Sequence, residues 1–353
     1  MSACRRAGGV VDWHNRPHGS QPTVIRCIAL AFALAAAADA GSSAAAPAVC
    51  NHSPAAAPAL ARLREALAHG RFVAYQPTSL QVINGRVTPA DPASIRADLT
   101  ILRPRFDSLV TYDAVHGAEN IPSIAASLKF RALIIGVWNP LDDAEVSAAI
   151  DAVRRYPRLV AGVSLGNEQL FSKRSELAGL TAVIASVRTR VPQTPLSTSE
   201  PFHIYYPQSA AALLGELDFL LANVHPIFQP WFRDAPDSAG AQLVVNVVTR
   251  LAQSYCGPIL VKETGVPTAP ASAGFSDARQ TSFYRELRQR FPATSDHAFA
   301  YFAAFDAPWR SGDATAVPGA HPEEAHWGLY DAARHAKPAA GELPLLTSPP
   351  SPP

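Results

Sequence analysis

Short apolar segments alternate along the chain with longer segments in which apolar residues recur every three or four positions. The short segments are typical of strands buried on both faces of a parallel sheet, and the longer ones of amphipathic helices packed against it. We predict strands at 72–76, 108–113, 132–138, 159–168, 195–199, 218–225, 257–263 and 298–305. Because strands and helices alternate with short connections, the pattern predicts an α/β fold whose parallel sheet closes into a (β/α)8 TIM barrel. A doubly wound open sheet is the alternative, but no glycine-rich phosphate loop follows the first strand.

Two of the predicted strands end in a glutamate rather than in turn residues. The segment LVAGVSLGNE closes with Glu168, and GPILVKETG carries Glu263 at its strand end. For either acid alone, a salt bridge or a solvated strand end is an equally good explanation. In a (β/α)8 barrel, however, the carboxyl ends of all strands surround one cavity, where acids are typically catalytic. The two glutamates together therefore predict a paired-carboxylate site, which is the arrangement that glycoside hydrolysis requires.

The composition fits one large catalytic domain. With 353 residues, 48% of them hydrophobic, the chain can bury a large core. A single barrel usually needs about 250 residues, and we predict one over 59–335. The formal net charge is +1 with both signs interleaved, which argues against a nucleic-acid binder. Beyond the N-terminal segment no stretch is long and apolar enough to cross a membrane, and we expect a monomer.

Both ends of the chain are predicted to lie outside the barrel. Residues 1–40 combine arginines, an apolar run and a small-residue cleavage site, as in a secretory signal peptide; an uncleaved N-terminal anchor is the alternative. An Ala/Ser/Pro-rich linker is predicted at 41–58 and a disordered Pro-rich tail at 336–353. The protein is therefore expected to be exported, to the periplasm or outside the cell, where Cys50 and Cys256 are the candidates for a disulfide.

Four motifs connect the chain to one enzyme family. They are VSLGNE at 163–168, LANVHPIF at 221–228, LVKETGVPT at 260–268 and AFDAPWR at 304–310. In their sequence, order and strand positions they resemble the family-17 glycoside hydrolases, and the similarity extends over roughly residues 70–335, as in a bacterial-type exported member. The resemblance implies a (β/α)8 barrel that hydrolyses or transfers β-1,3-glucans with retention of configuration.

The resemblance also implies roles for single residues. Glu168 takes the place of the general acid/base and Glu263 that of the nucleophile, while Asn167 corresponds to the residue that contacts the sugar 2-hydroxyl. This chain has Ile227 where many relatives carry the tyrosine of His-Pro-Tyr-Phe, and Ala307 where they carry an acid before Pro-Trp. These two departures leave the substrate length and the balance of hydrolysis and transfer open.

Aromatic residues near the predicted strand ends are candidates for sugar binding. Such rings pack on sugar faces, but they also serve as ordinary core or rim packing. We favour sugar contact for Trp138 and Trp309, because both directly follow strand ends. The two roles are about equally supported for three others, Tyr75, Tyr112 and Phe228. His225 is expected to bind substrate, because it stands at a strand end within the family motif.

Neighbouring charged residues are not expected to take part in the chemistry. If the strand alternates strictly, Lys262 faces opposite Glu263 and forms a structural salt bridge. The segment HPEEAH at 321–326 matches no helical zinc motif, so a solvated loop is expected, with no metal and no cofactor. The expected partner is a β-glucan oligo- or polysaccharide. The alternatives to a hydrolase are a β-1,3-glucanosyltransferase and a non-catalytic glucan-binding envelope protein, against which the two intact glutamates argue.

Overall fold

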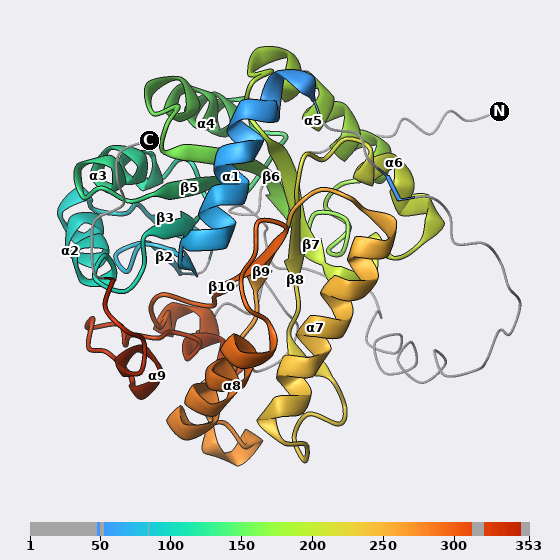
Figure 1. The fold of residues 1–353 in the computed structure, drawn as a ribbon. Helices are drawn as coiled ribbons and strands as arrows, with labels where there is room; N and C mark the ends of the chain where they lie inside the picture. The colour runs from blue at the N-terminus through green and yellow to red at the C-terminus, as the bar shows by residue number, and fades with distance from the viewer. Residues whose placement is uncertain (1–47, 50–52, 84, 313–320, 347–353) are drawn as a thin grey trace, which may run out of the picture.

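The computed structural model describes residues 48–49, 53–83, 85–312 and 321–346. Within this part of the chain, eight parallel strands close into a barrel (Figure 1). The strands are β1 (Phe72–Ala74), β4 (Ser108–Val110), β5 (Ala132–Val137), β6 (Val160–Asn167), β7 (Leu196–Pro201), β8 (Leu220–Asn223), β9 (Ile259–Glu263) and β10 (His297–Tyr301). The circle closes because β1 pairs in parallel with both β4 and β10. The predicted (β/α)8 barrel is therefore confirmed.

Helices connect successive strands and cover the outside of the barrel. They are α2 (Pro92–Leu102), α3 (Ile121–Ser127), α4 (Asp143–Arg155), α5 (Leu177–Arg190), α6 (Ala211–Leu214), α7 (Asp237–Ser254) and α8 (Asp277–Arg290). Helix α2 begins as predicted, because the Asp91 carboxylate accepts a hydrogen bond from the Ser94 N–H at 2.7 Å. Asp142 caps α4 in the same way. Glu145 does not complete a capping box, since its buried carboxylate accepts the backbone N–H of Trp138 at 2.6 Å instead.

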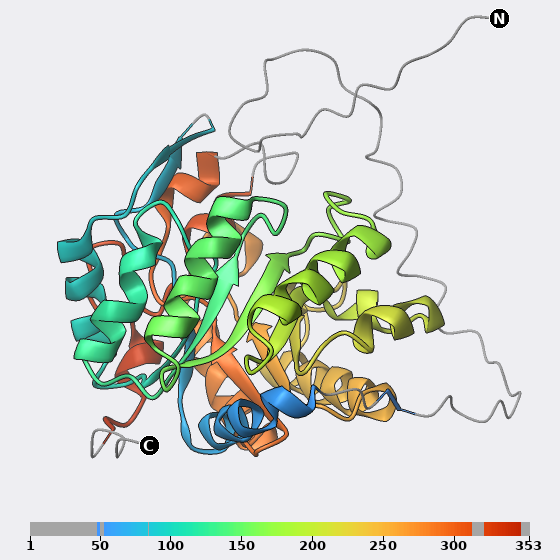
Figure 2. The same cartoon turned by 90° about the horizontal axis from the view of Figure 1, so that it is seen from above.

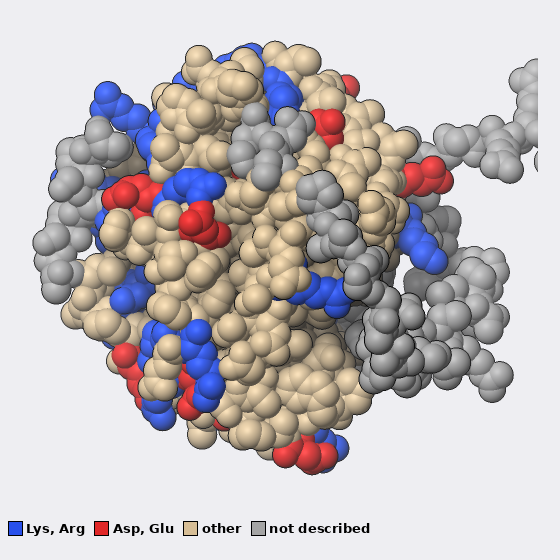
Figure 3. Space-filling model, turned by 45° about the vertical axis from the view of Figure 1, so that its right-hand side comes forward, with Lys and Arg blue, Asp and Glu red and all other residues tan. Residues whose placement is uncertain are grey.

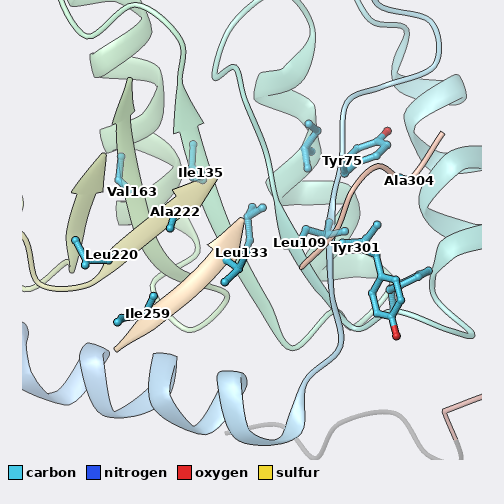
Figure 4. Packing of buried hydrophobic residues seen from close by; sticks show 14 of the residues in the cluster. Tyr75, Leu109, Leu133, Ile135, Val163, Leu220, Ala222, Ile259, Tyr301 and Ala304 are labelled. Atoms are coloured by element: carbon cyan, nitrogen blue, oxygen red, sulfur yellow. The ribbon is translucent and has the colours of Figure 1, made fainter. Parts of the chain in front are cut away.

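Side-chain alternation along the strands produces two apolar layers. Leu133 and Ile135 of β5 belong to the large cluster between the barrel and its helices, part of which is shown in Figure 4. Ile134 lies between them in the sequence and faces the barrel interior. There it joins a second cluster with Leu63 of α1 (Ala57–His69), the helix that closes the amino end of the barrel (Figure 1). The carboxyl ends of the strands therefore lie at the opposite end.

A hairpin that the strand pattern did not predict follows β1. Its strands β2 (Gln81–Ile83) and β3 (Arg86–Thr88) pair antiparallel. In Figure 2 this teal hairpin and the blue helix α1 lie at opposite ends of the molecule. The hairpin thus stands at the end of the barrel where the strands finish.

The boundary predicted for the N-terminal linker needs correction. Residues 53–58 belong to the fold, because a 3-10 turn, Pro54–Ala56, leads directly into α1. The turn is held by the Ser53 N–H, which donates to the buried Asp218 carboxylate at 3.0 Å. Composition predicted a linker here, but a long-range hydrogen bond and helix packing order the segment.

The predicted tail is also ordered where the structure describes it. Helix α9 (Pro338–Gly341) buries two alanines against α8, and Leu343 is buried after it. Before the helix, the Lys337 ammonium donates to the Asp306 carboxylate at 2.7 Å. Residues 336–346 are therefore part of the domain rather than a disordered tail, because they contribute to its core and its ion pairs.

The disulfide between Cys50 and Cys256 stays a prediction, because Cys50 lies outside the described residues. Val49 forms a parallel bridge with Tyr255, and its N–H donates to the Ser254 carbonyl at 2.9 Å. The residue before one cysteine is therefore beside the residue before the other, as the prediction requires.

The predicted signal segment, 1–40, likewise lies outside the described residues. In the part of the chain that the structure covers, no helix is long and apolar enough to cross a membrane. On the face shown in Figure 3, basic and acidic side chains are interspersed among uncharged ones. This mixture agrees with the balanced charge of the sequence.

Candidate active site

The two predicted catalytic glutamates lie at the carboxyl end of the barrel. Glu263 is the last residue of β9 and is 6% exposed. Glu168 directly follows β6, and its backbone is left-handed, with a φ of 55°. Its N–H remains in the barrel, donating to the Ser199 carbonyl of β7 at 2.7 Å. Gly166, with a φ of 94°, makes this turn possible, because a Cβ there would lie 2.4 Å from Gln169.

Asn223 of β8 links the two glutamates. It is the register partner of Glu263, and its Nδ2 donates to Glu168 Oε1 at 3.0 Å. The Ser199 hydroxyl donates to Asn223 Oδ1 at 3.0 Å, which fixes the direction of the amide. The sequence analysis did not single out Asn223, although it lies in the motif LANVHPIF. The site therefore contains a buried amide that is hydrogen-bonded to the predicted acid/base and belongs to the residue paired in register with the predicted nucleophile.

Glu263 has a histidine and a lysine as close neighbours. His225 Nε2 lies 3.3 Å from Glu263 Oε2, and Lys262 Nζ lies 3.4 Å from Glu263 Oε1. Burial alone would raise the pKa of Glu263, but attraction by Lys262, His225 and Arg310 outweighs it and lowers the pKa to about 2. Glu263 is therefore ionised over the whole physiological range.

The pKa of Glu168 is shifted in the opposite direction. Burial and, second, the negative charge of Glu263 raise its pKa, while the hydrogen bond from Asn223 opposes the rise. Glu168 thus binds a proton more strongly than an ordinary glutamate, while Glu263 binds one less strongly. Two carboxyl groups with pKa values pushed apart are what an acid and a nucleophile in one site require.

Lys262 does not face away from Glu263, and that expectation was wrong. Opposite β9, the residues Ala222 and Asn223 pair with Val261 and Glu263, so the register shifts by one at Lys262. Because of this irregularity, strict alternation fails, and both Lys262 and Glu263 reach the centre of the barrel end. Lys262 Nζ donates to Asn167 Oδ1 at 2.7 Å.

The candidate aromatic residues fall into different environments. Tyr75 is fully buried, and its hydroxyl donates to Asp98 at 2.9 Å, so it is a core residue and its predicted sugar contact is wrong. Tyr112 is 6% exposed and lies beside Lys262, with its ring centre 4.1 Å from Lys262 Nζ. Half-buried Trp138 stacks against Arg174 at 4.7 Å. Phe228 is 54% exposed at the rim of the site.

His225, which was expected to bind substrate, contacts the predicted nucleophile Glu263. Its ring lies among Phe228, Phe302 and Trp327, at centroid distances of 5.2 to 5.6 Å. Packing on several sides holds the imidazole against Glu263. Trp327, which is almost completely buried, was not identified from the sequence.

A groove of about 390 Å³ lies next to the site, and it shares Tyr112 with the surroundings of Lys262. Its walls come from the β2–β3 hairpin and from the loops after β1 and β10, and include Gln76, Ile83, Tyr112, Trp309, Arg310 and Trp327. Arg310 Nη2 donates to Gln76 Oε1 at 3.1 Å, which joins two of these loops across the groove. Among the described residues, no three His, Cys, Asp or Glu side chains are grouped closely enough to hold a metal ion.

A (β/α)8 barrel whose strand ends hold a buried and a half-buried glutamate of opposite pKa shift, beside a groove with aromatic walls, is typical of the glycoside hydrolase class. The chain belongs to the BtgE/BtgC glycoside hydrolase domain family, whose model matches residues 73–328. It is thus a glycosidase, as the sequence analysis predicted.

Two fungal relatives are named for their activities on glucosides. A glucan 1,3-beta-glucosidase of Arthroderma benhamiae is 28% identical over 265 residues, covering 70% of this chain and 84% of the relative. A probable beta-glucosidase, btgE, of Emericella nidulans is 30% identical over 181 residues, covering 49% of this chain. The chain spans only 31% of that second relative's length.

Solved structures share the fold. A β-1,3-glucanosyltransferase mutant from Rhizomucor miehei, in complex with laminaritriose, is 20% identical with a TM-score of 0.60, covering 76% of this chain and 96% of that one. An endo-laminarinase from Formosa is 16% identical with a TM-score of 0.59, covering 76% of this chain and 85% of that one.

Proposed function

We propose that the protein is a retaining β-1,3-glucan hydrolase in which Glu263 is the nucleophile and Glu168 the general acid/base. The observation that carries the proposal is the opposite pKa shift of two glutamates at the same end of the barrel, where Asn223 donates to Glu168 and is the register partner of Glu263. The choice of a β-1,3-glucan is supported by the family-17 motifs and by the relative from Arthroderma benhamiae, which is named a glucan 1,3-beta-glucosidase.

In the first step, Glu263 attacks the anomeric carbon and Glu168 protonates the departing glycosidic oxygen. The low pKa of Glu263 keeps the attacking carboxylate charged. His225 Nε2 lies 3.3 Å from Oε2 of that carboxylate and Lys262 Nζ lies 3.4 Å from Oε1, so both neighbours help to hold the nucleophile in place. The product of this step is a glycosyl ester on Glu263 and a shortened glucan with a free hydroxyl group.

In the second step, Glu168 removes a proton from the water that attacks the ester. The ester has no charge, so the repulsion that raised the pKa of Glu168 disappears at this stage. Asn223 continues to donate to Glu168 Oε1 and stabilises its ionised form. The same carboxyl group therefore serves as an acid first and as a base afterwards.

The substrate contacts belong to the same proposal. Asn167 contacts the 2-hydroxyl of the reacting sugar, where hydrogen bonds strengthen in the transition state. Trp309 and Tyr112 line the groove that receives the glucan. Trp138, which packs against the cluster of Tyr112 and Trp327, and exposed Phe228 are assigned as further sugar contacts at the rim of the site. His225 is assigned to the nucleophile, with the substrate as a second neighbour.

Glycosyl transfer is the second candidate activity. Ile227 packs beside the site against the cluster that contains Tyr112 and Trp327, and Ala307 lines the groove. Apolar side chains at these two places hold the attacking water less well than polar ones, which favours a sugar hydroxyl as the acceptor. The enzyme then extends glucans as well as shortening them.

One experiment tests these activities together. The purified protein is incubated with laminarin and with defined β-1,3-oligosaccharides at rising concentration, and the products are resolved by length. Shorter products alone indicate hydrolysis, and products longer than the substrate indicate transfer. Binding without any product supports a non-catalytic glucan-binding protein and contradicts the proposal.

We further propose that residues 1–40 direct export of the protein. N-terminal sequencing of the secreted protein tests this.

A further inference from the structure

Lys262 is a buried lysine at the site to which the double displacement assigns no proton transfer and no bond. The residue is 1% exposed, and its ammonium group has three neighbours. Nζ lies 2.7 Å from Asn167 Oδ1, 3.4 Å from Glu263 Oε1 and 4.1 Å from the centre of the Tyr112 ring. Burying an ammonium group is costly unless it is paired and hydrogen-bonded. Each of these three contacts offsets part of that cost, so the position of Nζ is well determined.

The contact with Asn167 determines which end of that amide faces the sugar site. An ammonium group only donates hydrogen bonds, so it pairs with the amide oxygen and not with the amide nitrogen. The main chain of Asn167 is held independently, because its carbonyl accepts from Arg174 and its register partner is Ser199. Lys262 therefore restricts rotation of the Asn167 side-chain amide. With the oxygen occupied, Asn167 offers its two N–H donors to a ligand.

We propose that Lys262 is a positioning residue for recognition of the substrate 2-hydroxyl, because it holds Asn167 as a hydrogen-bond donor beside Glu263. The inference rests on the proposed function, in which Asn167 contacts that hydroxyl. Lys262 itself touches no reacting atom. Its effect on catalysis passes through the orientation of Asn167 and through the carboxylate next to it.

Loss of Lys262 should weaken the discrimination between substrates with and without the 2-hydroxyl, in addition to any loss of activity. A site that holds a donor for a hydroxyl rejects the analogue without that hydroxyl, because the buried donor is then left unpaired. Without Lys262, the Asn167 amide is free to turn, and the preference for the natural sugar declines. The ratio of kcat/KM for a 2-hydroxyl substrate to kcat/KM for its 2-deoxy analogue measures this preference.

The test compares an aryl β-laminaribioside with the analogue that lacks the 2-hydroxyl on the reacting ring. Lys262→Met removes the charge and the donor at similar length, and we expect it to lower the ratio by roughly 10- to 100-fold, the range for one hydrogen bond to a charged group. Asn167→Ala should lower the ratio to a similar extent. Adding Lys262→Met to Asn167→Ala should change the ratio no further.

Lys337 provides the matched control. Its ammonium group also lies at the carboxyl end of the barrel, donating to Asp306 at 2.7 Å and to Thr268 at 2.9 Å, but it does not contact Asn167 or either glutamate. Lys337→Met therefore removes a partly buried cation from a carboxylate without turning the Asn167 amide. We expect this variant to lose thermal stability and to keep the wild-type ratio.

The outcomes separate this inference from the proposed function. If the wild-type protein cleaves neither glycoside, the proposed function fails and the inference with it. If the wild type is active and Lys262→Met keeps the ratio, the inference alone is overturned. Should Lys262→Met be too unstable to assay, Lys262→Arg keeps the buried charge but displaces the donor. The same fall in the ratio is then expected, and an unchanged ratio overturns the inference.

Discussion

Asp98 connects helix α2 to the loop after β1, where Thr78 lines the groove, and to the C-terminal segment, and its replacement by alanine should loosen these segments together. The side chain is fully buried on α2. Its carboxylate accepts hydrogen bonds from the Tyr75 hydroxyl at 2.9 Å, from the Thr78 N–H at 2.9 Å and from the Thr78 hydroxyl at 2.8 Å. It also accepts from Arg334 Nε at 2.7 Å, which anchors the C-terminal segment. Asp98→Ala leaves all of these donors without their acceptor.

The cost follows from the burial of this network. Removing one partner of a buried ion pair typically destabilises a protein by about 3–5 kcal/mol. The Arg334 side chain is 27% exposed, so water recovers part of the loss, and we expect the lower end of the range, about 3 kcal/mol. For a domain of this size each kcal/mol lowers Tm by about 2–4 °C, which predicts a fall of about 6–12 °C.

Kinetics should change as well, because Asp98 holds Thr78 at the wall of the groove next to the β2–β3 hairpin. We expect Asp98→Ala to raise KM for laminarin more than it lowers kcat. Differential scanning calorimetry measures the first effect, and initial rates over a range of laminarin concentrations measure the second. Both are compared in the same preparation of the variant.

Asp107 is the matched control at the other end of the barrel. It is 3% exposed and pairs with Arg131 Nε at 2.9 Å, just before β4 begins. Asp107→Ala should lower Tm by a similar amount and leave KM unchanged. The reasoning is refuted if Asp98→Ala lowers Tm by less than about 2 °C, less than the shift expected for 1 kcal/mol, or if the two variants raise KM equally.

Two further predictions concern the glutamate pair. Glu263→Ala should abolish turnover, whereas Glu168→Ala should still cleave an aryl glycoside whose leaving group needs no proton. Added azide should then give the β product with Glu168→Ala and the α product with Glu263→Ala, and the reverse pairing of products would exchange the two roles. The second prediction concerns pH: because Asn223 stabilises ionised Glu168, Asn223→Ala should raise the pKa of Glu168. The alkaline limb of kcat/KM, set by loss of the acid's proton, should move to higher pH; an alkaline limb that moves to lower pH contradicts this geometry. The acid limb, set by Glu263 with a pKa of about 2, should stay in place.

Local sequence patterns were sufficient to predict the barrel and the place of its site. Each predicted strand contains or overlaps an observed one. A short run of apolar residues between amphipathic helices is most easily accommodated as a buried strand. The Asp91 cap was also readable, since a cap is an interaction between residues three positions apart. Glu168 and Glu263 were found because an acid at the end of such a strand has no explanation in the strand itself.

By itself, then, the sequence predicted the order of the barrel strands and helices, the closed barrel and the two acids, because these follow from apolar periodicity within each segment and from the alternation of segments along the chain. Only the tertiary structure decided what Tyr75 and Lys262 do. A register shift between β8 and β9 turns Lys262 toward Asn167, and a buried aspartate on α2 takes the Tyr75 hydroxyl into the core. Both outcomes depend on partners from distant parts of the chain, whose positions are set by packing and strand register, which no local pattern of residues records.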